Sequence, residues 1–121
     1  MNQHNHVGSS ERSRNAYQSL DVYRVTLALA EGVHRARIGD AELRDQLRRA
    51  SKSAFLNLAE GLPSRSRANA SRHFSIAIGS LCETHAGLDL ARAIAVLDGG
   101  ECDRLQVLAT RATKMLRAMR A

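Results

Sequence analysis

The sequence contains few of the residues that build β-sheets or disulfide-bonded domains. Aromatic residues make up only 3% of the 121 residues, tryptophan is absent, and Pro63 is the single proline. Alanine, leucine and arginine are abundant instead, which favours helices over an all-β fold. Cys82 and Cys102 are too few for a disulfide framework, so a reduced, cytoplasmic setting is expected. No apolar run approaches the roughly 20 residues that span a bilayer, so we expect no membrane-embedded segment.

Apolar residues at three- and four-residue spacing predict four amphipathic helices, over residues 20–37, 40–60, 68–97 and 101–119. Asp40 is a good N-cap for the second helix, and Gly61 followed by Pro63 is a typical stop signal. Residues 1–18 are polar without apolar periodicity and are expected to form a disordered tail. Short connections between amphipathic helices predict that residues 19–121 fold as an all-α, antiparallel up-down four-helix bundle.

A polar row runs beside the apolar face of the helix predicted over residues 40–60. Steps of three and four residues place its members on one side of the helix: Gln46, Arg49, Ser53, Asn57 and Glu60. The third predicted helix offers Ser80 and Glu83 on one patch, and an ion pair between Glu83 and Arg49 would connect the two helices. Buried polar groups persist only when they are paired, so we expect a structural polar network that fixes helix register. A ligand-binding or catalytic role for these residues is the alternative.

A long, gapped motif extends from the second predicted helix into the third. It reads Asp45-Gln-Leu-Arg-Arg-Ala-Ser-Lys-Ser-Ala-Phe-Leu-Asn-Leu-Ala-Glu-Gly61, then Arg65-Ser66, then Phe74-Ser-Ile-Ala-Ile-Gly-Ser-Leu-Cys-Glu83. This motif resembles the four-helix-bundle proteins encoded in intervening sequences of bacterial 23S ribosomal RNA genes. The resemblance implies an antiparallel four-helix bundle, often assembled as a ring-like pentamer. The same architecture is shared by the accessory variability protein of diversity-generating retroelements, a basic pentamer that binds nucleic acid and the reverse transcriptase.

Positive charge is in excess and unevenly placed. The chain has 18 basic and 12 acidic residues and a net charge of +6. Residues 61–74 and 104–121 contain basic residues but no acid, whereas the second predicted helix is neutral, with Arg44, Arg48 and Lys52 forming a solvent-compatible ridge. Guanidinium groups match phosphate geometry, so the candidate nucleic-acid-binding residues are Arg65, Arg67, Arg72, Arg111, Lys114 and Arg117. Basic residues near a helix C-terminus also complement the helix dipole, which is the purely structural alternative.

We expect no catalytic residues, no cofactor and no bound metal. Di-iron bundles use paired Glu-x-x-His motifs; Glu31 and His34 make one such spacing, but Glu83 and His85 lack the interval for a second. Neither a glycine-rich phosphate loop, a nucleophile elbow nor a paired-cysteine zinc spacing is present. A di-iron oxidoreductase is therefore the weakest of the functional classes.

The sequence predicts a non-enzymatic, oligomeric four-helix bundle whose basic surface binds the RNA or DNA backbone, or a nucleic-acid enzyme. One alternative is an accessory protein of a diversity-generating retroelement that binds its reverse transcriptase. Another is a protein-interaction scaffold whose positive charge meets an acidic partner. Self-association is expected in each case, with the pentamer implied by the resemblance. The sequence does not distinguish RNA from DNA or indicate a base preference.

Overall fold

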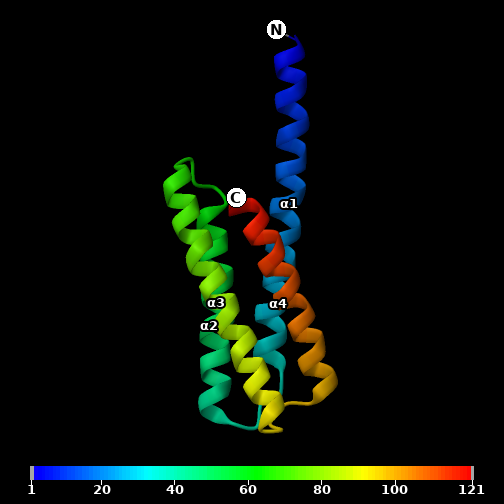
Figure 1. Ribbon diagram of the computed structural model, residues 1–121, viewed down its shortest axis with the longest axis vertical. Coiled ribbons are helices and arrows are strands. Elements are labelled where there is room, and N and C mark those ends of the chain that lie inside the picture. The colour runs from blue at the N-terminus through cyan, green and yellow to red at the C-terminus, as the bar shows by residue number, and fades with distance from the viewer. Residues whose placement is uncertain (1, 121) are drawn as a thin grey trace.

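The computed structural model describes residues 2–120, with side chains from Ser19 to Arg120. Its four α-helices are α1 (Asn2–Arg35), α2 (Ala41–Gly61), α3 (Arg67–Ala93) and α4 (Gly99–Arg120). They run alternately up and down (Figure 1), and the described residues contain no β-strand. All four helices lack a continuous apolar stretch of the length that spanning a bilayer requires. The prediction of an all-α four-helix bundle is confirmed.

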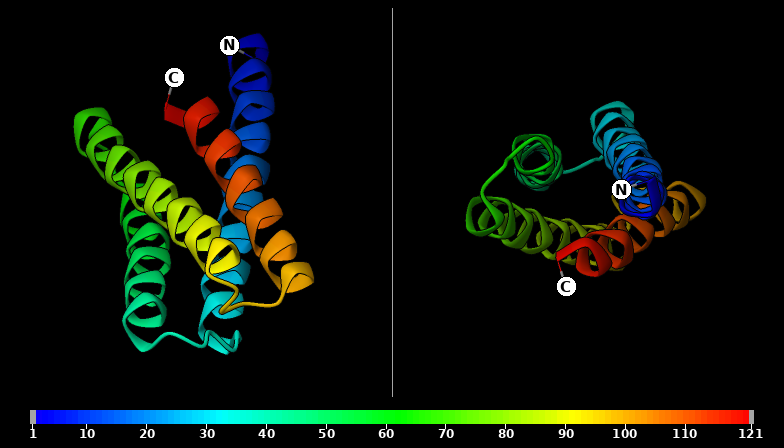
Figure 2. Two further views of the ribbon diagram at one scale, coloured as in Figure 1. Left: turned by 60° about the horizontal axis from the view of Figure 1, so that its bottom comes forward. Right: turned by 90° about the horizontal axis from the view of Figure 1, so that it is seen from above.

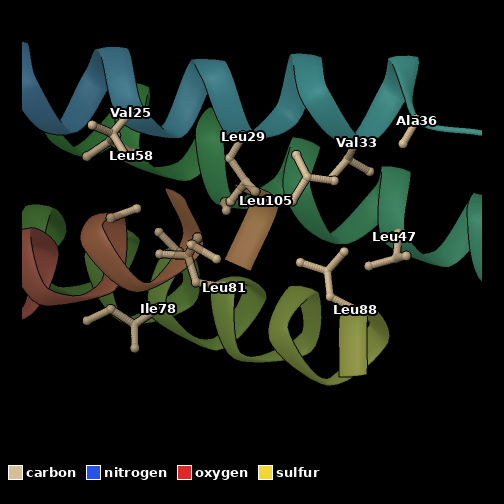
Figure 3. Close-up of a cluster of buried hydrophobic side chains, with 14 of the residues drawn as sticks. Val25, Leu29, Val33, Ala36, Leu47, Leu58, Ile78, Leu81, Leu88 and Leu105 are labelled. Carbon is tan, nitrogen blue, oxygen red and sulfur yellow. The ribbon is translucent and has the colours of Figure 1, made fainter. Parts of the chain in front are cut away.

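Each helix lies against two neighbours, so the bundle has four corners when seen from one end (Figure 2). α2 packs on α3, α3 on α4, α4 on α1 and α1 on α2, while the diagonal pairs lie further apart across the core. Leucines from all four helices meet in the centre (Figure 3), among them Leu29, Leu58, Leu81 and Leu105, which are completely buried. Burying each such side chain contributes about 1.5–3 kcal/mol, so the core is the main source of stability.

Two glycines allow neighbouring helices to approach closely. A Cβ atom at Gly32 in α1 would lie 2.5 Å from Cδ2 of Leu105 in α4. A Cβ atom at Gly87 in α3 would lie equally close, 2.5 Å, to Cδ2 of Leu47 in α2. Both distances are shorter than any normal contact, so the close spacing of these helix pairs requires a residue without a side chain at each of the two positions.

The starts of three helices are set by side-chain caps. Asp40, Ser66 and Asp98 precede α2, α3 and α4 and each accepts a hydrogen bond from the backbone N–H three residues later, at 2.8, 3.1 and 3.0 Å. Such caps satisfy one of the backbone donors that a helix start leaves free. The short polar side chains at these positions therefore fix where the connections end.

α3 ends at Ala93, before the predicted boundary at residue 97. Ala95 adopts a left-handed conformation with φ of 58°, and the N–H of Val96 binds the carbonyl of Ala91 at 3.0 Å, which closes the helix. Leu97 is nonetheless buried because the α3–α4 loop folds over the core. Apolar periodicity therefore continued past the true end of the helix.

α1 begins at Asn2, in place of the disordered tail expected over residues 1–18. Figure 1 shows this first part of α1 projecting beyond the ends of the other three helices. A helical segment that packs against no other helix needs no apolar stripe, so periodicity predicted only the part from about residue 20. The prediction for residue 1 lies outside the described residues.

Candidate nucleic-acid interface

The six basic residues predicted to contact nucleic acid lie toward one end of the bundle. We call it the α2–α3 loop end; it comprises residues 62–66, the first turns of α3 and the second half of α4. Figure 1 shows that the α2–α3 loop and the end of α4 lie at this same end. Nη1 of Arg120 in α4 donates a hydrogen bond of 3.4 Å to Oγ of Ser75 in α3, which joins the two helices there. The residues concerned are Arg65, Arg67, Arg72, Arg111, Lys114 and Arg117.

All six of these side chains are exposed, and none belongs to an ion pair within the described residues. Two arginines near the start of α4 differ, because Arg92 in α3 pairs with Asp103 and Arg104 in α4 pairs with Glu101. Hydrogen bonds to these carboxylates raise the pKa of Arg92 and of Arg104 above the usual arginine value. The six positive charges at the α2–α3 loop end therefore remain without carboxylate partners within the described residues.

The middle of the polar row on α2 is hydrogen-bonded to α3. Oγ of Ser80 donates to Oγ of Ser53 at 2.9 Å, and Nδ2 of Asn57 donates to the same Oγ at 3.3 Å and to the Ser53 carbonyl at 3.0 Å. Nδ1 of His73 lies 3.1 Å from Oδ1 of Asn57 and 3.4 Å from Oε2 of Glu60. Ser80 is buried and Ser53, Asn57 and His73 are half-buried. These five side chains form one network between the two helices.

Three residues predicted for this network lie outside it. Gln46, Arg49 and Glu83 are exposed, and no hydrogen bond or ion pair joins Arg49 to Glu83 in the described part of the chain. Gln46 and Glu83 instead border an apolar groove of about 200 Å³ between α2 and α3. His73 was missed, although it precedes Ser80 by seven residues and such spacing places two residues on one side of a helix.

The opposite end of the bundle contains basic residues that the sequence analysis did not assign to a site. We call it the two-loop end, because the α1–α2 loop (residues 36–40) and the α3–α4 loop (residues 94–98) meet there. A hollow of about 630 Å³ at this end is lined by several arginines, including Arg37, Arg44 and Arg48. The four-residue spacing of Arg44 and Arg48 was visible in the sequence, but the path of the loop that brings Arg37 beside them was not.

His34, from the single Glu-x-x-His spacing, and the thiol of Cys102 each lie against a backbone carbonyl group. Nδ1 of His34 lies 3.1 Å from the carbonyl of Ala30, one turn earlier in α1. Sγ of Cys102 is directed at the carbonyl of Leu88 at 3.4 Å, and burial raises the pKa of this thiol. Among the side chains that the structure describes, no three His, Cys, Asp or Glu residues come close enough to hold a metal ion.

Comparison with known proteins agrees with this architecture. Residues 18–118 match the model of a family described as the 23S rRNA-intervening sequence protein. A crystal structure from Bacteroides thetaiotaomicron, described as a protein of unknown function from the S23 ribosomal protein family, matches with a TM-score of 0.77 at 20% identity, covering 85% of this chain and 97% of that one. No curated protein matches the sequence significantly. The family match includes the second half of α1, all of α2 and α3 and nearly all of α4, and the chain belongs to the 23S rRNA-intervening sequence protein family.

Proposed function

We propose that this protein is a non-enzymatic, cytoplasmic adaptor that assembles with copies of itself and binds the phosphate backbone of nucleic acid. The observation that carries the proposal is the set of six exposed basic side chains at the α2–α3 loop end, none of which has an ion-pair partner among the described residues. Charges without carboxylate partners remain available for phosphates. Binding of this kind positions a strand without reading its bases.

The small number of aromatic residues supports backbone binding over base recognition. Phe55 and Phe74 are half-buried and buried, respectively, and the ring of Tyr23 packs edge-on against Phe55 with centroids 5.0 Å apart. Tyr23 is 39% exposed, but its ring is held against Phe55, so the described aromatic side chains offer no row of free rings such as single-strand binding proteins use for stacking. We therefore expect little discrimination between sequences.

Apolar residues on the outer face of α3 support self-association. Ile76 and Leu90 lie on one side of this helix, and Ile94 directly follows its last residue; the three side chains are 42%, 50% and 47% exposed. The apolar groove between α2 and α3 adjoins Leu90. A second copy packed against this face would cover both, and repetition around a ring would bring several basic ends together. The mass of the native assembly tests this step: Leu90→Glu should shift it toward the monomer, whereas Val107→Glu, on the outer face of α4, should not.

Salt dependence tests the nucleic-acid contact directly. Log K should fall linearly with log salt, with a slope of about −5 for a duplex or about −4 for a single strand if six phosphates are contacted. Fluorescence anisotropy of unrelated labelled RNA and DNA at several salt concentrations measures this slope. Nucleic-acid binding whose affinity does not change with salt, or no binding at low salt, contradicts the proposal. Either result favours a scaffold for a protein partner.

A matched pair of double variants tests the location of the contact. Arg111→Gln with Arg117→Gln removes two charges from the α2–α3 loop end and should reduce the slope by about 2. Arg24→Gln with Lys52→Gln removes the same charge from exposed positions on α1 and α2 and should change it little. Equal effects of the two pairs would show that net charge alone drives binding.

A further inference from the structure

The hollow at the two-loop end is strongly basic. It lies between the end of α1, the first turns of α2 and the α3–α4 loop, and its volume is about 630 Å³. Its lining contains no acidic residue and four arginines, Arg35, Arg37, Arg44 and Arg48. Volumes of about 300–1,000 Å³ are typical of sites for small ligands. Charge and size together suit a small anion or the end of a larger one.

Two of these arginines have buried N–H groups without an acceptor. Nε of Arg44 and Nε of Arg48 are both buried and neither has a hydrogen-bond partner in the structure. Arg48 uses another nitrogen, Nη2, to donate 3.1 Å to the carbonyl of His34 at the end of α1. A buried donor without an acceptor is unfavourable, so a shift of either side chain that turns its Nε toward an anion in the hollow would remove a cost that the folded chain carries.

The carboxylates that pair with two arginines of the hollow do not neutralise it. Oδ1 of Asp45 lies 3.9 Å from Nε of Arg44, which is too far for a hydrogen bond. The pair between Glu31 and Arg35 is equally long at 3.9 Å, and both side chains are largely exposed. Asp40 is engaged as the N-cap of α2. Long, solvent-exposed pairs contribute little, so the four guanidinium groups determine the local potential.

The floor of the hollow is built from backbone that is held in place. The N–H of Gly39 in the α1–α2 loop donates a 2.8 Å hydrogen bond to the carbonyl of Val96 in the α3–α4 loop. Ile38 next to it is 4% exposed and belongs to the core. The two loops are therefore joined to each other and to the bundle, so the loop backbone that borders the hollow is preorganised.

We infer that this hollow binds a phosphate monoester. A monoester carries a charge of about −1.5 to −2 at pH 7, whereas each backbone diester carries a single charge, so a site with four arginines favours the monoester. Arg44 and Arg48 lie four residues apart on α2, so their planar guanidinium groups can bind different oxygens of one phosphate group. The ligand is the terminal phosphate of a nucleic-acid strand or a free phosphorylated small molecule. The site lies at the opposite end from the proposed backbone-binding surface and does not depend on it.

Titration calorimetry of the intact protein, in buffer without phosphate or sulfate, tests the inference. The probes are inorganic phosphate, adenosine monophosphate, and a short DNA strand with either a 5′-phosphate or a 5′-hydroxyl. We expect the phosphorylated strand to bind about tenfold more tightly than the hydroxyl strand. Binding of inorganic phosphate and the mononucleotide at similar affinity indicates a free phosphorylated ligand, whereas preference for the phosphorylated strand alone indicates a strand terminus. Both results support the monoester site.

Neighbouring substitutions on one helical row provide the matched control. Arg44→Gln should lower the affinity for the monoester about tenfold, because it removes a charged donor from the site. Lys52→Gln, which removes the same charge from an exposed position on the same ridge outside the hollow, should leave it unchanged. Arg37→Gln, in the α1–α2 loop, replaces Arg44→Gln if the latter alters the thermal unfolding curve.

Two results would overturn the inference. One is no binding of inorganic phosphate or adenosine monophosphate together with equal affinity for the 5′-phosphate and 5′-hydroxyl strands, and the other is an equal loss of affinity in Arg44→Gln and Lys52→Gln. The titration with inorganic phosphate contains no nucleic acid, so its outcome is independent of backbone binding at the α2–α3 loop end.

Discussion

Replacing Ser53 or Ser80 with alanine tests whether their hydrogen bond holds α2 against α3. The bond is 2.9 Å long, and Ser80 is only 7% exposed. Ser53→Ala leaves the Ser80 hydroxyl against a methyl group, and a buried polar group without a partner costs about 1–3 kcal/mol in the free energy of unfolding. Ser53 also accepts from Asn57, so this substitution should be more harmful than Ser80→Ala.

The double variant should be less destabilised than the sum of the two single variants. When both hydroxyls are absent, the Ser80 donor no longer lacks a partner, and Asn57 keeps its 3.0 Å bond to the Ser53 carbonyl. Replacing both partners by apolar groups is nearly neutral in many proteins. We therefore expect the double variant to lie within about 1 kcal/mol of the wild type, and the cycle to give a coupling energy of about 1 kcal/mol or more.

Urea unfolding followed by circular dichroism provides the free energies, provided that the slopes of the transitions agree. Ser71→Ala is the control, because Ser71 is exposed on α3 and substitution there measures only the change in helix propensity, within about 0.5 kcal/mol. Additive effects that match this control would refute the reasoning. The apolar core alone would then set the register of the two helices.

Three further predictions concern packing and the cysteines. Gly79→Ala should stabilise α3 by about 0.5–1 kcal/mol, because a Cβ atom there meets nothing within 4 Å. Gly32→Ala should be about 1–3 kcal/mol less favourable than Gly79→Ala, because its Cβ atom meets the side chain of Leu105. Thermal unfolding of the two variants measures this difference. Iodoacetamide should modify the exposed Cys82 in the folded protein and the buried Cys102 only after unfolding, which mass spectrometry resolves. Burial raises the pKa of Cys102 in the folded protein above its value in the unfolded chain. The free energy of unfolding should therefore be unaffected by this thiol below the unfolded pKa of about 8.5 and should decrease as the pH rises above it. The urea midpoint of Cys102→Ala should fall less over this pH range than the midpoint of the wild type.

The sequence predicts four helices and their antiparallel order because each helix buries one regular apolar stripe. The helix ends were predicted less well, since Ile38 and Leu97 enter the core from loops and extend the apolar pattern beyond Arg35 and Ala93. Periodicity reports which residues are buried, and a loop that folds over the end of a bundle also buries residues. Only the backbone, through the φ of 58° at Ala95, shows where the helix stops.

The sequence also places Ser53 and Asn57 beside the apolar stripe, and the structure brings both against α3. It does not identify their partners, because the register of two helices depends on contacts such as that between Gly87 and Leu47. If α3 were shifted by one residue relative to α2, the residue opposite Asn57 would be a neighbour of His73 whose side chain lies on another side of the helix. Partners across an interface are therefore much harder to predict than the side of the helix that forms it.

The net charge of a sequence segment likewise does not show which charges lie together in the folded protein. Counting charges by segment identified the α2–α3 loop end, where no acid interrupts the basic residues, but the neutral second helix concealed the hollow at the other end. Asp45 follows Arg44 in the chain, yet successive residues on a helix point about 100° apart, and Asp45 does not line the hollow. A segment whose charges cancel can thus present several positive charges to one space. The positive potential in the hollow follows from Arg35, Arg37, Arg44 and Arg48, and the phosphate titration tests whether this potential binds an anion.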